Sequence, residues 1–304
     1  MALALLWKEK GVRSQEALGN LLQDPAYAPR KGRRGIGHAG TLDPFAEGWL
    51  LVGVDEGTKF LSVFQGFEKE YQAEMLIGVT SKSLDTDEDM EFAGDPNFEK
   101  FLGPRENWDK KLSQFLESKI GTFDQIPPQF SAIRVGGSKR AYDYARKGET
   151  VELKARPATI LEAQHLSVEV DSSTYAQPVV KWTFTVKVSS GTYIRSLARD
   201  WGQELLGSPG MLSGLIRTEI AGLGKSHKRS GVHYLSVEDL RSFFKLSPIS
   251  FLEVDGLRNG GLWHARPSDR AELLLCPETM EVVAFTQTPN GNLGRVFLND
   301  PLRI

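Results

Sequence analysis

The chain of 304 residues contains a single cysteine, Cys276. One cysteine can form neither an internal disulfide nor a thiolate cage around a metal ion, which excludes disulfide-rich scaffolds and cysteine-based zinc modules. A long apolar run is lacking at the start of the chain, where residues 2–7 are followed at once by Lys8. That stretch is too short for the core of a signal peptide, and no basic segment precedes it. We therefore expect a cytoplasmic protein that does not bind membranes.

An excess of charge of one sign is also lacking, because 37 basic and 39 acidic residues leave a net charge of −2. Hydrophobic residues make up 40% of the chain and charged residues 25%, which is the balance of an ordinary globular protein. This balance excludes a disordered, collagen-like or membrane-spanning chain. The length exceeds the usual domain size of about 100–200 residues, so it predicts one large domain or two unequal ones.

Basic residues are nevertheless unevenly distributed along the chain. They gather in three clusters, which comprise Arg30, Lys31, Arg33 and Arg34, then Lys139, Arg140, Arg146 and Lys147, and finally Arg217, Lys225, His227, Lys228 and Arg229. Acidic residues gather elsewhere, chiefly between residues 85 and 95. Segregated basic patches in a chain of nearly neutral total charge are typical of proteins that bind a polyanion on one face. Each cluster alone is equally compatible with a solvated surface.

Apolar and polar residues alternate in two long stretches, residues 71–79 and 180–188. Period-two alternation predicts half-buried strands. Residues 194–205 instead carry apolar side chains at helical spacing after a Ser-Ser-Gly turn, which predicts a helix. Strands with one polar face, interspersed with helices, indicate an α+β fold with a largely antiparallel sheet rather than a doubly wound parallel one.

The texture of the sequence changes after Lys245. Prolines and glycines then interrupt short stretches, and residues 281–286 and 294–298 are typical of strands. We therefore predict a first domain over residues 1–246 and a small β-rich second domain over residues 247–304.

Glycines and a histidine surround a single carboxylate in residues 35–44, Gly-Ile-Gly-His-Ala-Gly-Thr-Leu-Asp-Pro. The glycines allow a ligand to approach the backbone closely. Pro44 pushes Asp43 away from helical geometry towards an extended one, so the carboxylate is held on a loop shortly after the first basic cluster. This arrangement favours a functional role for Asp43, although Asp before Pro is also common in ordinary turns.

Residues 37–44, with Ala46, Gly48 and Leu50, resemble the signature of the TruB family of tRNA pseudouridine synthases. Four further blocks resemble the family in the same order along the chain. These are residues 69–71 with Gly78, Thr80, Thr86 and Asp87; residues 125–128 with Ser131, Ala132, Tyr142, Ala145, Arg146 and Gly148; residues 190–200; and Leu215, Arg217, Thr218 and Gly222. The tail resembles the small PUA-type RNA-binding barrel of bacterial members.

The resemblance implies the pseudouridine synthase fold, with a mixed, largely antiparallel central sheet flanked by helices and a small C-terminal PUA-like β-barrel. It also implies an isomerase that converts uridine at position 55, in the T-arm of tRNA, to its C-glycoside isomer pseudouridine. Such an enzyme flips the target base out of the folded RNA and needs no metal, cofactor or guide RNA. We expect a monomer.

The resemblance assigns three catalytic positions. Asp43 matches the family's catalytic aspartate, which either forms a covalent intermediate with the uracil ring or the ribose or drives elimination. Tyr71 matches the aromatic residue that stacks on the target base and can move the proton from its C5 atom. Arg195 matches the partner that keeps the aspartate ionised and oriented. From the residues alone, a core tyrosine and a surface arginine with its stem on the sheet are the alternatives.

Six further residues are expected to bind the RNA. His38 resembles the histidine that occupies the space vacated by the flipped nucleotide, Leu215 is expected to line the uracil pocket, and Lys59 matches a family position. Phosphate contacts are expected from the basic residues Arg33, Arg34 and Arg146. From the residues alone, His38 is equally a loop histidine, Lys59 a surface lysine and Leu215 a core residue.

The sequence departs from the family pattern in four respects. Residues 8–14 lack its Pro and Thr, which leaves the roles of Lys8 and Lys10 open, and the spacing between Thr80 and Thr86 is wider than usual. Phe130 stands where a Tyr is usual, and Arg134 stands where a Lys is usual. None of these departures touches the block around Asp43.

Three other functions are compatible with parts of the sequence. A guide-dependent relative that modifies ribosomal RNA is normally longer and carries strongly basic tails, whereas this chain ends at Ile304 with only Arg303 nearby. A tRNA-binding folding chaperone that has lost catalysis is disfavoured by the intact Asp43, Tyr71 and Arg195. A carboxylate-based glycosidase needs a second catalytic carboxylate as acid, and no motif supplies one.

Overall fold

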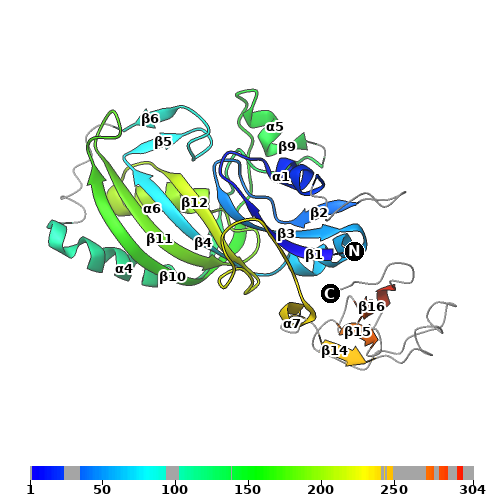
Figure 1. The fold of residues 1–304 in the computed structure, drawn as a ribbon. Coiled ribbons are helices and arrows are strands. Elements are labelled where there is room, and N and C mark those ends of the chain that lie inside the picture. Colours follow the sequence, from blue (N-terminus) through cyan, green and yellow to red (C-terminus); the bar gives the residue numbers. More distant parts are fainter. Residues whose placement is uncertain are drawn as a thin grey trace. The chain divides into compact units, whose positions relative to one another are not determined.

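The computed structural model describes residues 2–23, 35–93, 103–137, 139–240, 243, 245–248, 272–276, 281–286 and 293–296 (Figure 1). The chain divides into two compact units, one from residues 1–42, 48–66 and 223–304, the other from residues 43–47 and 67–222. None of the helices in the described part of the chain combines the length and apolar character needed to span a bilayer.

The first unit contains an antiparallel sheet in which β1 pairs with β13 and β3, and β3 also pairs with β2. Its strands are β1 (Ala2–Lys8), β2 (Ile36–Ala39), β3 (Glu47–Val54) and β13 (Val232–Tyr234). Its helical segments are α1 (Ser14–Leu21), η2 (Asp55–Phe60), α2 (Leu61–Phe64) and α7 (Val237–Leu240). After Glu47 every residue of β3 is buried, so this strand forms the centre of the unit.

Lys8 lies at the end of β1 and is fully buried. Its ammonium donates hydrogen bonds to the carbonyl oxygens of Glu9, at 3.0 Å, and Val12, at 2.7 Å. A buried charge is tolerated when such hydrogen bonds replace its water. Lys8 therefore holds the turn between β1 and α1, which gives this lysine a structural role.

The second unit contains an antiparallel sheet in the order β12–β4–β11–β10–β7 (Figure 1). Its strands are β4 (Lys69–Ile77), β7 (Gly121–Gln125), β10 (Arg156–Asp171), β11 (Val179–Val188) and β12 (Gly210–Ile220). The remaining elements are β5 (Val79–Ser81), β6 (Met90–Phe92), η3 (Arg105–Asn107), α4 (Trp108–Ser118), β8 (Arg134–Val135), β9 (Lys139–Arg140), α5 (Ala141–Ala145) and α6 (Ile194–Leu206). The two strands predicted from alternation and the predicted helix are confirmed as β4, β11 and α6.

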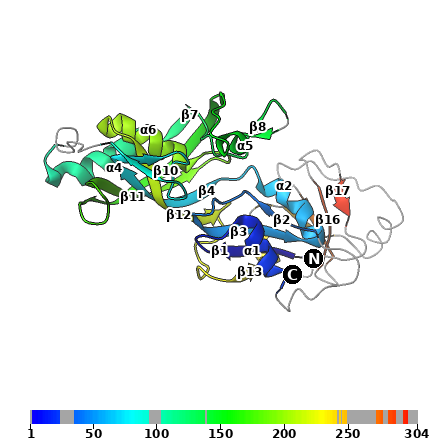
Figure 2. The ribbon, with the colours of Figure 1, turned by 90° about the horizontal axis from the view of Figure 1, so that it is seen from above.

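Helices α4 and α6 cover the same face of this sheet (Figure 2). Aromatic rings fill the space between them: Trp201 of α6 lies 5.9 Å from Trp182 and 5.2 Å from Phe184 of β11, measured between ring centroids. A side chain at Gly210 of β12 would lie 2.4 Å from the backbone oxygen of Ala198, so only glycine allows this approach. The close packing fixes α6, and with it the residues of its first turn, against the sheet.

Four short strands are described in the tail, in the order β14–β15–β16–β17. They are β14 (Lys245–Pro248), β15 (Glu272–Cys276), β16 (Glu281–Thr286) and β17 (Leu293–Val296). Strand β16 coincides with the predicted strand over residues 281–286. The described tail residues contain no pairing of β14 with β17 that would close a barrel. The PUA-like barrel and the domain boundary after residue 246 remain predictions.

Candidate active site

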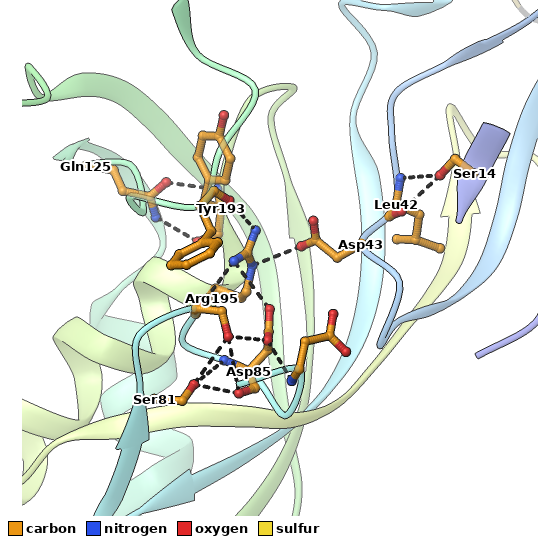
Figure 3. A network of polar contacts seen from close by, with 11 residues as sticks. Ser14, Leu42, Asp43, Ser81, Asp85, Gln125, Tyr193 and Arg195 are labelled. Carbon is orange, nitrogen blue, oxygen red and sulfur yellow. Dashed lines mark hydrogen bonds and ion pairs between the residues drawn. The ribbon is translucent and has the colours of Figure 1, made fainter. Parts of the chain in front are cut away.

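Arg195, in the first turn of α6, lies at the centre of a polar network in the second unit (Figure 3). Its side chain is only 5% exposed. The Nε atom lies 2.9 Å from Oδ2 of Asp43, and Nη1 lies 3.3 Å from Oδ2 of Asp85. The predicted pair of Asp43 and Arg195 is therefore present, and the alternative of a surface arginine is wrong.

Two backbone carbonyls complete the surroundings of the Arg195 guanidinium. Nη1 donates to the oxygen of Ser83 at 2.6 Å, and Nη2 donates to the oxygen of Phe130 at 2.9 Å. The planar fork of an arginine has five N–H donors in fixed directions, so partners on several sides determine its orientation. Arg195 consequently presents Nε to Asp43 in one defined direction.

Asp43 lies on the loop between β2 and β3, and its side chain is 36% exposed. Its backbone oxygen accepts a hydrogen bond from the amide of Ala46 at 3.2 Å, so the residue also forms a turn, as its position before Pro44 predicts. The carboxylate thus combines a charged partner on one side with access from solvent. Those are the two properties that a carboxylate nucleophile or base needs.

Asp85 is the buried carboxylate of the network, with a side chain 3% exposed. Its Oδ1 accepts hydrogen bonds from the Ser83 hydroxyl at 2.5 Å and from the Asp87 amide at 3.0 Å. Burial raises the pKa of Asp85, while the charge of Arg195 and these hydrogen bonds act in the opposite direction. Asp85 therefore joins the loop after β5 to the first turn of α6.

Asp85 is not among the residues that the family resemblance marks, which are its neighbours Thr86 and Asp87. In the structure Asp87 contributes its backbone amide to Asp85, and its side chain is exposed. A usable signal lies in the two-residue spacing of Ser81, Ser83 and Asp85, because the Ser81 hydroxyl donates to the Asp85 carbonyl at 2.5 Å. Short polar side chains that bond to nearby backbone are typical of such tight turns.

Tyr71 and Leu215 lie on the neighbouring strands β4 and β12 and are 8% and 6% exposed. Leu215 pairs with Ala73 across the two strands, and residues two apart on a strand share a face. Tyr71 and Leu215 therefore share one face of the sheet. It is the face covered by α6, since Ala73 also pairs with Phe184, which packs on Trp201.

The other predicted binding residues are only partly covered by the structure. His38 is half-buried on β2 in the first unit. Arg146 follows α5 and is exposed, with its guanidinium carbon 5.9 Å from the centroid of the Tyr142 ring. Arg33, Arg34 and the side chain of Lys59 lie outside the described residues.

A cavity of about 340 Å³ lies in the second unit, between the end of β7, the start of β10 and the loop before α6. Its lining includes Gln125, Pro127, Arg156, Gly191 and Tyr193. Burial raises the pKa of the Tyr193 phenol, whose surroundings include the charges of Arg156, Arg195 and Asp43. Within the described residues no group of three or more His, Cys, Asp or Glu side chains is placed to hold a metal ion.

Lys69, two residues before Tyr71, is a buried lysine with an unusually low pKa. Burial, and secondly the charge of Arg217, lower the pKa of Lys69 from 10.5 to about 8. Its ammonium donates a hydrogen bond to the carbonyl of Phe67 at 2.6 Å. The protein accepts a buried ammonium here, at a cost in stability that is largest below the folded pKa.

We expect a Lys69→Met variant to be more stable than the wild type near neutral pH and to lose this advantage as the pH rises. Between the folded pKa of about 8 and the unfolded value of 10.5, the unfolded wild-type chain binds more protons, so wild-type stability rises with pH in this window. Urea unfolding of both proteins between about pH 7 and pH 10 measures the difference. A difference independent of pH would contradict the lowered pKa.

Comparison with known protein families identifies the family of this chain. The family model described as "TruB family pseudouridylate synthase (N terminal domain)" matches residues 30–194. This range contains Asp43, Tyr71 and Asp85, and it ends one residue before Arg195. The fold and this match define an isomerase. The chain belongs to the TruB family of pseudouridylate synthases.

Individual relatives agree with the family match. A protein of Phocaeicola vulgatus named tRNA pseudouridine synthase B is 43% identical over 186 residues, which cover 61% of this chain and 71% of the relative. A protein of Limosilactobacillus reuteri with the same name is 36% identical over 236 residues, covering 78% of this chain and 70% of the relative.

A solved structure described as "Crystal Structure of a Cbf5-Nop10-Gar1 Complex" is similar in fold, with a TM-score of 0.61 and 19% identity. The similarity covers 97% of this chain and 84% of that chain. This likeness supports the predicted pseudouridine synthase fold with its central sheet.

Proposed function

We propose that this enzyme converts the uridine at position 55 of the tRNA T-arm to pseudouridine without a guide RNA. The relatives named tRNA pseudouridine synthase B support tRNA as the substrate. The observation that carries the proposal is the 2.9 Å contact between Asp43 and the buried Arg195, because it provides an oriented carboxylate that solvent can reach.

The reaction breaks the bond between N1 of uracil and C1′ of ribose and forms a bond between C5 and C1′. The C5 proton leaves and N1 gains a proton, so the isomerisation consumes no external reagent. Asp43 is the group that attacks the ring or the ribose, or that assists elimination. Arg195 holds this carboxylate in one orientation through the 2.9 Å contact from its Nε atom.

The base is held by residues of the sheet face under α6. Tyr71 stacks on the uracil ring and moves the proton from C5, and Leu215 lines the same pocket. Both side chains are already buried on adjacent strands, which supports a rigid pocket rather than a mobile one.

The target uridine lies within folded RNA and has to be flipped out, which costs a few kcal/mol. His38 fills the space that the base leaves, and Lys59 is a further RNA-binding residue. Arg33, Arg34 and Arg146 contact phosphates. Residues 1–246 form the catalytic domain in this proposal, and residues 247–304 form a PUA-like module that binds the same RNA. One monomer acts on one tRNA.

Phosphate contacts predict a steep dependence of tRNA affinity on salt. An Arg33→Ala/Arg34→Ala double variant should bind tRNA more weakly, and the slope of log affinity against log salt should fall by about 0.7–0.9 for each lost contact. Lys110→Ala/Lys111→Ala is the matched control, since both lysines are exposed on α4 and the net charge changes equally. Equal slopes for the two double variants would remove Arg33 and Arg34 from the interface.

The proposal is tested by incubating the purified protein with an unmodified tRNA transcript and mapping pseudouridine at single-nucleotide resolution. We expect modification at position 55 alone, without added RNA. Modification that appears only with a guide RNA, release of free uracil, or refolding of tRNA without modification would each contradict it. These outcomes correspond to a guide-dependent enzyme, a glycosidase and a chaperone, respectively.

A further inference from the structure

We propose that Gln125 is a positioning residue for the reaction, which acts on Asp43 through the backbone of Tyr193 and the side chain of Arg195. This inference rests on the proposed function. Gln125 is the last residue of β7, the edge strand of the second sheet, and is 2% exposed, whereas most residues of β7 are exposed. A buried amide is unfavourable unless its donor and acceptor are both paired.

The Gln125 amide pairs with a single residue at both of its polar atoms (Figure 3). Its Oε1 accepts a hydrogen bond from the Tyr193 backbone amide at 2.8 Å, and its Nε2 donates to the Tyr193 carbonyl at 3.1 Å. The side chain therefore binds Tyr193 as a neighbouring strand would. These two bonds join β7 to a residue 68 positions further along the chain.

Tyr193 is the residue at which α6 begins. Its backbone is extended, with φ −98° and ψ 109°, and no side chain caps the helix there. Its carbonyl also accepts the first helical hydrogen bond, from the Leu197 amide at 3.2 Å. The Gln125 clamp thus sets the direction in which the helix leaves the loop, in place of an ordinary cap.

Arg195 follows two residues later, so its position depends on this starting direction. The residue that follows β7 reinforces the docking, because the Ser196 hydroxyl donates to the Ile126 carbonyl at 2.9 Å. Without the clamp, a small rotation of the first turn moves the guanidinium relative to Asp43. Displacements of about 1 Å in a reacting group can lower a rate about 100-fold.

A second glutamine provides a matched control. Gln129 makes the same type of clamp, since its Nε2 donates to the Val151 carbonyl at 2.9 Å and the Val151 amide donates to its Oε1 at 3.0 Å. This clamp does not involve α6. Gln125→Met and Gln129→Met therefore each remove one bidentate amide of equal size. Only the first removes the support of the start of α6, whereas Gln129 adjoins Phe130, which contributes one of the two carbonyls around Arg195.

The experiment compares wild type, Gln125→Met and Gln129→Met with an unmodified tRNA transcript. Single-turnover rates at saturating tRNA measure the chemical step, equilibrium binding measures affinity, and thermal unfolding confirms that each protein is folded. We expect Gln125→Met to lose about 10–100-fold in rate with affinity within about 2-fold of wild type, and Gln129→Met to lose less rate than Gln125→Met. A folded Gln125→Met with the wild-type rate, or a loss confined to affinity, would overturn the inference.

Gln125→Glu keeps the proposal testable if the methionine variant fails to fold. A protonated carboxyl offers the same donor and acceptor as the amide, whereas the ionised form lacks the donor for the Tyr193 carbonyl. The rate relative to wild type should therefore rise as the pH falls, and a constant ratio would overturn the inference. The wild type carries the same charged groups around Tyr193, namely Arg156, Arg195 and Asp43. Their effects on the rate therefore cancel in the ratio of the variant rate to the wild-type rate. An inactive wild type would instead contradict the proposed function.

Discussion

An Asp43→Asn variant should bind tRNA like the wild type and form no detectable pseudouridine. The amide keeps the size and most hydrogen bonds of the carboxylate but lacks its charge, so it cannot form the intermediate or serve as a base. We expect a loss of at least about 1,000-fold in the single-turnover rate, the scale seen when a catalytic nucleophile is removed. Pseudouridine mapping measures the rate and filter binding measures the affinity.

The same variant separates two roles of Asp43. As a residue that forms a turn before Pro44, Asp43 is well replaced by Asn, so a purely structural role predicts nearly full activity. The loss of stability should be small, about 1 kcal/mol, because Asp43 is one-third exposed and Arg195 retains Asp85. Circular dichroism checks the fold, and mass spectrometry checks that the new amide has not hydrolysed. Substantial turnover by such a preparation would contradict the proposed mechanism.

An Arg195→Lys variant should lose at least about 100-fold in rate and about 2–4 kcal/mol in the free energy of unfolding. The ammonium retains the charge, but a single nitrogen cannot reach two carboxylates and two carbonyls in the directions of the guanidinium fork. The carbonyls of Ser83 and Phe130 and the buried Asp85 are then left incompletely paired. Urea unfolding measures the loss of stability, and the single-turnover assay measures the loss of rate.

Arg199→Lys is the control for this variant. Arg199 lies one turn further along α6, and its 34% exposed side chain pairs with the adjacent Asp200. Its Nη2 also donates to the Ile126 carbonyl at 3.0 Å, a single hydrogen bond that a lysine ammonium can replace. Exposed pairs of this kind contribute about 0–1 kcal/mol, so the variant should stay close to wild type in stability and rate. Similar losses for both variants would indicate that Arg195 contributes only as a general helix residue.

Local sequence patterns predicted the sheet of the second unit because strand burial repeats every two residues. Residues 180–188 alternate strictly, and residues 71–75 do so up to Leu76. The structure pairs their strands, β11 and β4, along nearly their whole length, with β4 ending at Ile77. The helix over residues 194–205 was also predictable from the sequence, because the apolar stripe that packs on the aromatic rings of β11 recurs at helical spacing. The period of burial depends on the local helix or strand geometry, so it can be predicted from the local sequence.

The active-site contacts could not be obtained in this way. Spacing offers no reason to connect Asp43 with Arg195, and only the resemblance to the TruB family suggested the pair. Asp85 could not be found from spacing, because its partner Arg195 is far away in the sequence. Arg195 lies 112 positions after Ser83, which is close to Asp85, and no local periodicity indicates a contact over such a separation. In the sequence, Gln125 has the character of an ordinary polar residue of an edge strand. Its role becomes visible only from its two hydrogen bonds with Tyr193 in the structure. Long-range polar contacts depend on the completed fold.

If the oriented carboxylate of Asp43 drives isomerisation of one uridine in tRNA, the hydrogen at C5 has to leave, because C5 becomes the glycosidic carbon of pseudouridine. An unmodified tRNA transcript with tritium at C5 of its uridines reports this step, as tritium released to water by the wild-type protein. We expect release that stops at one equivalent per tRNA, with the tRNA mass otherwise unchanged. Stable binding of the tRNA without any release of tritium would refute the proposed function.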